Sequence, residues 1–127
     1  MNHLRALHKR VVKDDGRYPF TIPAVQSLTE LAFTTPVTFF VGANGSGKST
    51  LLEAIACAAG SIPVGSENLD TDKTLAATYS PILMAYPGAT IFSFDESPIQ
   101  PVVYDDLEHV AITRSFLNNP EQYLRHL

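Results

Sequence analysis

Short runs of β-branched and aromatic residues, separated by Gly- and Pro-containing segments, form the hydrophobic pattern of this chain. The clearest run, residues 37–41 (VTFFV), is apolar at both odd and even positions and predicts a strand buried on both faces. Weaker runs predict further strands over residues 3–13, 28–33, 74–78, 90–94 and 99–104.

Two longer segments have the apolar spacing of helices, one over residues 47–60 and one over 105–117. Asp105 or Asp106 is expected to cap the second helix, because Asp105 and Glu108 have the spacing of a capping box. A helical turn over 81–86 and an irregular loop over 61–72 complete the pattern. The alternation of strands with helices predicts an α/β fold.

The composition narrows the class of protein. The chain has 127 residues, of which 45% are hydrophobic and 17% are charged, and this predicts a single globular domain over 1–127. No apolar run approaches the ~18 residues needed to span a bilayer. The lone Cys57 cannot form an internal disulfide, which favours a reducing, cytoplasmic setting. Its place among alanines predicts a small buried residue.

The net charge of −4 is unevenly distributed along the chain. Residues 64–127 carry three basic and nine acidic side chains. Because binding to nucleic-acid phosphates requires clustered Lys and Arg, the acidic second half argues against a nucleic-acid partner.

One motif carries specific chemistry. Residues 42–49, GANGSGKS, match the pattern G-x-x-x-x-G-K-[S/T] of a phosphate-binding P-loop between a strand and a helix. The glycines let backbone N–H groups converge on phosphate oxygens, Lys48 supplies a charge, and the Ser49 hydroxyl suits Mg²⁺. The sequence therefore predicts binding of a nucleoside triphosphate with Mg²⁺. The binding residues that it predicts are Asn44, Gly45, Ser46, Gly47, Lys48, Ser49 and Thr50.

A second pattern leaves hydrolysis open. Residues 91–94 (IFSF), apolar except for Ser93, precede Asp95-Glu96, as in the Walker B motif of ATPases. In one interpretation Asp95 holds Mg²⁺ and Glu96 polarises water, which would make the chain an active ATPase. In the other, both are polar residues of a hairpin turn, and the chain is a nucleotide-binding domain or a non-catalytic interaction or relic module.

Two pieces of the chain resemble a known family. Residues 18–60 resemble the N-terminal part of the bacterial AAA-family (ABC-type) ATPases that stand alone, and residues 74–127 resemble their C-terminal part. The resemblance implies an abbreviated P-loop NTPase with a three-layer fold, in which strand 37–41 lies between strands 74–78 and 90–94. Antiparallel N-terminal strands precede this small parallel core. Residues 61–73 stand where the family has its glutamine loop, signature motif and Walker B strand.

The resemblance also implies roles for single residues. Tyr79 stands where the family has a histidine that contacts the γ-phosphate, and a phenol donates a hydrogen bond but is a poor base near neutral pH. Asp95 and Glu96 follow the switch strand, so they imitate Walker B without occupying its place. ATP and Mg²⁺ are the implied cofactors, with hydrolysis weak or absent unless a partner chain completes the site. Loss of the Walker B strand leaves residues 74–78 as an exposed edge, which predicts a homodimer or another protein covering it. Tyr18 is a candidate contact for the nucleotide base.

Overall fold

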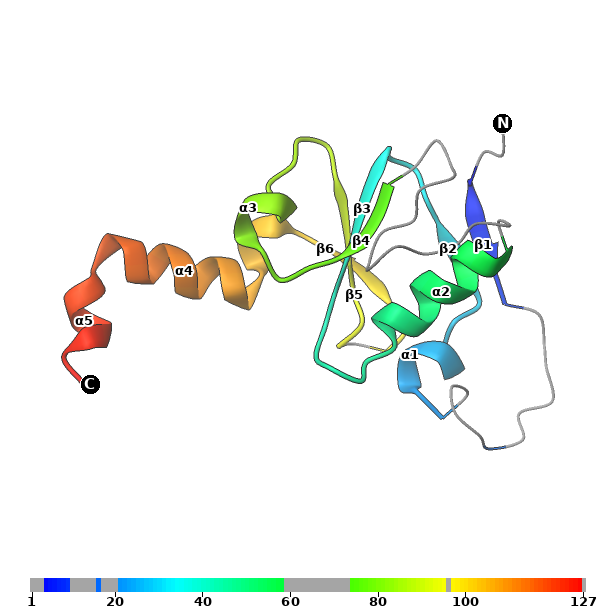
Figure 1. Cartoon of the computed structure of the whole chain (residues 1–127), viewed down its shortest axis with the longest axis horizontal. Helices are drawn as coiled ribbons and strands as arrows, with labels where there is room; N and C mark the ends of the chain where they lie inside the picture. Colours follow the sequence, from blue (N-terminus) through cyan, green and yellow to red (C-terminus); the bar gives the residue numbers. More distant parts are fainter. Residues whose placement is uncertain (1–3, 10–15, 17–20, 59–73, 96, 127) are drawn as a thin grey trace.

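The computed structural model describes residues 4–9, 16, 21–58, 74–95 and 97–126 (Figure 1). Predictions that fall on the other residues, including the loop over 61–72, the base contact of Tyr18 and the role of Glu96, lie outside the described part of the chain.

A four-stranded sheet forms the centre of the molecule. Its strands are β3 (Val37–Val41), β4 (Thr74–Ala77), β5 (Thr90–Ser93) and β6 (Gln100–Val102), in the spatial order β4-β3-β5-β6. Strands β4 and β5 both run parallel to β3, and Phe40 pairs with Ala77 on one side and Phe92 on the other. The predicted place of strand 37–41 between the other two is therefore confirmed. The short β6 runs antiparallel to β5.

A separate antiparallel pair precedes the sheet in sequence. Strands β1 (Ala6–His8) and β2 (Glu30–Ala32) pair with Ala6 opposite Ala32. This agrees with the expected antiparallel N-terminal strands, although each strand is shorter than the run that predicted it.

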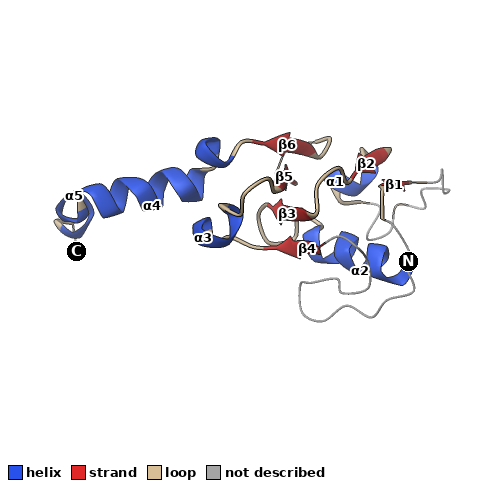
Figure 2. Cartoon of the chain, turned by 90° about the horizontal axis from the view of Figure 1, so that it is seen from above, coloured by secondary structure: helices blue, strands red, loops and turns tan. Residues whose placement is uncertain are grey.

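The helices lie on both sides of the sheet and beyond its end (Figure 2). They are α1 (Pro23–Gln26), α2 (Lys48–Ala58), α3 (Pro81–Met84), the 3₁₀ turn η1 (Tyr104–Asp106), α4 (Glu108–Asn118) and α5 (Pro120–Leu124). Helices α4 and α5 project away from the sheet (Figures 1 and 2), and the side chains of α4 are mostly exposed. None of the helices in the described ranges has the length and apolar content needed to cross a membrane.

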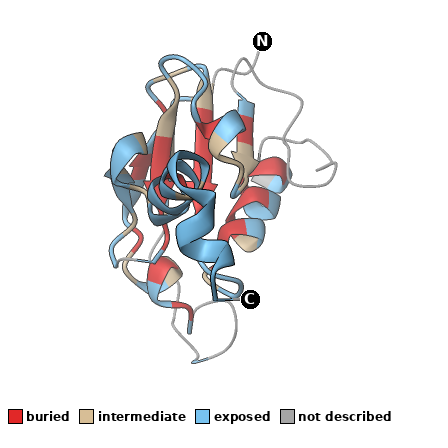
Figure 3. Ribbon diagram, turned by 90° about the vertical axis from the view of Figure 1, so that its left-hand side faces the viewer, coloured by how far each residue is buried: buried red, intermediate tan, exposed pale blue. Residues whose placement is uncertain are grey.

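Two buried clusters cover the two faces of the sheet (Figure 3). Phe40, Leu75 and Phe92 pack with Leu52 and Ile55 of α2. On the opposite face, the strand residues that alternate with these, Phe39, Val41 and Ile91, pack with Met84 of α3 and Val110 of α4. Side chains of neighbouring strand residues point to opposite faces, so a central strand with both faces covered requires the continuous apolar run of β3.

The predicted cap of the C-terminal helix is wrong. Residues 104–106 turn as a 3₁₀ helix, and Leu107, in an extended conformation, becomes the N-cap of α4 without any side-chain cap. The Asp105 carboxylate instead accepts a hydrogen bond from the Arg114 guanidinium, at an N–O distance of 2.9 Å. The capping-box spacing fails here because the extra turn places Asp105 before the helix begins.

The predicted burial of Cys57 is also wrong, since this residue is exposed. Among the described residues of α2 the buried apolar side chains are Leu51, Leu52, Ile55 and Ala56, and they form one stripe that faces the sheet. Cys57 lies on the other face of the helix, so its alanine-rich surroundings in sequence do not correspond to a buried position.

Candidate nucleotide-binding site

The segment between β3 and α2 has the backbone conformation that its glycines allow. Gly42, Gly45 and Gly47 have φ values of 152°, 82° and 104°, in the region that L side chains rarely adopt. Gly42 is also confined: a Cβ atom there would lie 2.8 Å from Ser46 Oγ and 3.0 Å from Phe94 Cβ. The loop can therefore turn tightly over the end of β5 only because residue 42 has no side chain.

Helix α1 supports the other end of this loop. A Cβ atom at Gly47 would lie 3.2 Å from Cγ2 of Ile22, the residue that precedes α1. Ile22 and Ala24 are both buried in the cluster that includes α2. No local pattern predicted α1 or this contact, because it joins residues far apart in sequence.

The Lys48 ammonium group is held inside the loop. It donates hydrogen bonds to the backbone oxygens of Gly42 and Ala43 and to Ser46 Oγ, the last two at 3.0 and 3.4 Å. The side chain is buried, and its Nζ atom lies 5.3 Å from the centroid of the Tyr79 ring. An ammonium group has three hydrogens to donate, so a phosphate that contacts Lys48 must replace or share one of these partners.

A hollow of about 220 Å³ lies over the start of α2. Its lining consists of Asn44, Gly45, Gly47, Lys48, Ser49 and Thr50. These are the residues predicted to bind phosphate, except Ser46, whose hydroxyl contacts Lys48 instead. The first turn of a helix leaves N–H groups without helical partners and carries a partial positive charge, and both favour an anion.

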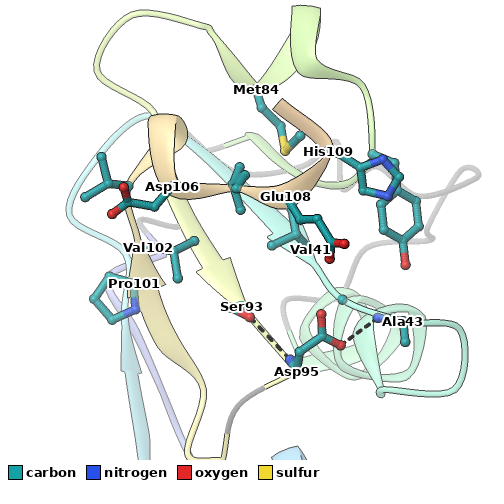
Figure 4. A pocket seen from close by; sticks show the side chains of 14 residues that line it. Val41, Ala43, Met84, Ser93, Asp95, Pro101, Val102, Asp106, Glu108 and His109 are labelled. Atoms are coloured by element: carbon teal, nitrogen blue, oxygen red, sulfur yellow. Dashed lines mark hydrogen bonds between the residues drawn. The ribbon is translucent and has the colours of Figure 1, made fainter. Parts of the chain in front are cut away.

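Asp95 contacts the P-loop directly (Figure 4). It lies just beyond the carboxyl end of β5, and its Oδ1 atom accepts a hydrogen bond from the Ala43 N–H at 2.8 Å. Its own N–H donates to Ser93 Oγ at 3.3 Å. The structure therefore brings Asp95 to the P-loop, whereas Glu96 lies outside the described residues.

A larger cavity of about 660 Å³ adjoins the P-loop at Gly42 and Ala43. Among the described residues that line it, Asp95, Asp106 and Glu108 are acidic and none is Lys or Arg. The side chains of Glu108, from the first turn of α4, and Asp95 extend into the same space (Figure 4). The negative carboxylates of this cavity repel phosphate, so the phosphates of a nucleotide are favoured in the hollow over α2 and disfavoured here.

Tyr79 lines the larger cavity and lies close to Lys48, which lines the hollow over α2. Its ring is near Lys48 on one side and packs against His109 of α4 on the other, with ring centroids 4.9 Å apart. The position expected to replace the switch histidine is therefore close to the P-loop. The contact with His109 was not predicted, because two aromatic residues thirty positions apart carry no local signal of their packing.

Comparison with known proteins identifies the family. The family model described as AAA domain matches residues 21–92, which is more than half of the chain and extends from before α1 into β5. Neither the curated proteins nor the solved structures gave a match. The matched segment includes the whole P-loop, the hollow over α2 and Tyr79. The chain therefore belongs to the AAA domain family, a family of AAA-type P-loop ATPases.

Proposed function

We propose that this chain binds ATP with Mg²⁺ in the hollow over α2, and that hydrolysis is weak or absent unless a partner chain completes the site. The observation that carries the proposal is the coincidence of the P-loop, the start of α2 and the Lys48 ammonium at one hollow. In this arrangement backbone N–H groups of residues 44–50 hold phosphate oxygens, Lys48 neutralises charge, and the Ser49 hydroxyl is a ligand for Mg²⁺.

Weak hydrolysis is proposed because the groups that activate water are sparse in the described part of the site. Phosphoryl transfer to water needs a carboxylate for Mg²⁺ and a group that orients the attacking water. Of the described carboxylates, Asp95 contacts the P-loop, and one of its oxygens is already bonded to the Ala43 N–H. Tyr79 has a phenol where the ABC-type ATPases that the chain resembles have the imidazole of a histidine, and a phenol is a weaker base.

An active ATPase is the second candidate, and the position of Asp95 favours it. This residue follows a strand parallel to β3 and lies against the P-loop, which is compatible with holding Mg²⁺ through its second oxygen. In this alternative Glu96 polarises the attacking water.

A phosphate-release assay separates the two candidates. The wild-type protein is assayed with ATP and Mg²⁺ beside two variants, Glu96→Gln and Asp106→Asn. The second variant is the control, because it removes a different carboxylate, one that lines the acidic cavity. We expect release close to the uncatalysed rate for all three proteins. A robust rate that falls by about 100-fold or more in Glu96→Gln but not in Asp106→Asn would establish the active ATPase, since a general base typically contributes 10²–10⁴-fold.

A further inference from the structure

We infer that Asp95 is a positioning residue for the P-loop, and that it acts as a hydrogen-bond acceptor for the Ala43 N–H rather than as a charge or a ligand of Mg²⁺. The inference rests on the proposed function for its consequence on nucleotide affinity. The hydrogen bond itself can be measured in the nucleotide-free protein.

The contact joins the end of β5 to the start of the P-loop. The end of β5 is fixed to β3 by the Phe94 N–H, which donates to the Val41 oxygen at 2.8 Å. Asp95 follows directly, its backbone bonded to Ser93 Oγ and its carboxylate to Ala43. The first residues of the P-loop are thus attached to the neighbouring strand as well as to their own.

The same contact decides which backbone N–H groups remain for phosphate. Asp95 occupies the N–H of Ala43, and Ala43 lines the acidic cavity rather than the hollow over α2. The lining of the hollow begins at Asn44. The carboxylate therefore marks the boundary of the phosphate site, and it orders the loop before a nucleotide arrives.

A carboxylate at this boundary also opposes binding, because its charge repels phosphate. The hydrogen bond and the charge therefore have opposite effects on affinity, and substitutions can separate them. Asparagine keeps an oxygen that can accept from Ala43 and removes the charge, whereas alanine removes both. A ligand of Mg²⁺ would show a third pattern, in which the loss appears only when Mg²⁺ is present.

The experiment combines two measurements on the wild type, Asp95→Asn, Asp95→Ala and the control Asp106→Ala. Asp106 lines the same cavity with the same charge, and its carboxylate makes no hydrogen bond or ion pair with the described residues. Hydrogen exchange of the Ala43 amide is followed without nucleotide, and ATP affinity is measured by titration calorimetry with Mg²⁺ and with EDTA. Asp95 is exposed, and thermal unfolding checks that each variant is folded.

We expect Ala43 to exchange slowly in the wild type, Asp95→Asn and Asp106→Ala, and faster in Asp95→Ala. Asp95→Ala should bind ATP about tenfold more weakly than Asp95→Asn, with and without Mg²⁺, because both variants lack the charge and only asparagine keeps the hydrogen-bond acceptor. Asp95→Asn should bind at least as tightly as the wild type, because it keeps the acceptor and removes the repulsion.

Three results overturn the inference. The first is equal exchange of the Ala43 amide in the wild type and Asp95→Ala, and the second is equal ATP affinity of Asp95→Asn and Asp95→Ala. The third is a loss of ATP affinity in Asp95→Asn that appears with Mg²⁺ and not with EDTA. The second result would assign the effect to charge and the third to metal binding. If the wild type binds no ATP while Ala43 exchange follows the expected order, the proposed function fails and the positioning contact stands.

Discussion

At the scale of single residues, Gly42 is the position in the P-loop with the least freedom to change. It combines a positive φ with close approaches from two directions, by Ser46 Oγ and by Phe94 Cβ. Ser46 Oγ is in turn bonded to Lys48, and Phe94 is a buried core residue. Neither neighbour can move away without disturbing the loop or the core.

Replacing Gly42 with Ala is expected to destabilise the protein by about 1–3 kcal/mol for the unfavourable backbone conformation, with a further loss because the added Cβ is crowded. The measurement is the free energy of unfolding in urea. Gly88→Ala is the matched control, because Gly88 also has a positive φ (75°) but no atom lies within 4 Å of its added Cβ. The steric argument would be wrong if both variants lost the same stability.

At the scale of elements, the strands around β3 could be predicted because burial on both faces requires a continuous apolar run. The start of α2 could be predicted because a P-loop ends where a helix begins. Helix α1, with four residues, is too short to show a hydrophobic period. The cap of α4 depends on the 3₁₀ turn over 104–106, and the exposure of Cys57 depends on which face of α2 meets the sheet. Local spacing contains neither piece of information.

Strand β4 lies at the edge of the sheet in the described structure. An edge strand has backbone groups available for pairing, so we propose that a second copy of the chain, or another protein, covers β4. Light scattering coupled to size-exclusion chromatography should give about twice the chain mass of 13.9 kDa at high protein concentration.

Thr74→Lys should shift the protein toward monomer, because lysine on an edge strand opposes pairing. Thr74 and Thr113 are both exposed, and Thr113→Lys on the projecting helix α4 is the control for added charge. A wild-type protein that stays monomeric at all concentrations would exclude the self-association.

At the scale of the whole molecule, the acidic second half and the P-loop meet at the carboxyl ends of β3 and β5. The structure gathers three carboxylates of that half, Asp95, Asp106 and Glu108, in the cavity beside the P-loop. The sequence predicted the P-loop residues because their function depends on local spacing. It did not predict the cavity, because β5, η1 and α4 contribute to it from separate parts of the chain.

The central claim is that Lys48 and the loop around it form a nucleotide site, and titration calorimetry with ATP and Mg²⁺ tests it most directly. The wild type is compared with Lys48→Ala and with Lys9→Ala. Lys9 is a matched control, since its ammonium also donates to two backbone oxygens, those of Val25 and Gln26, but outside the P-loop.

We expect the wild type and Lys9→Ala to bind ATP at a single site with equal affinity. Lys48→Ala should bind at least about tenfold more weakly, because charge-assisted hydrogen bonds to phosphate are lost. The claim is contradicted if neither ATP nor GTP binds the wild type at millimolar concentration, or if Lys48→Ala binds ATP as tightly as the wild type.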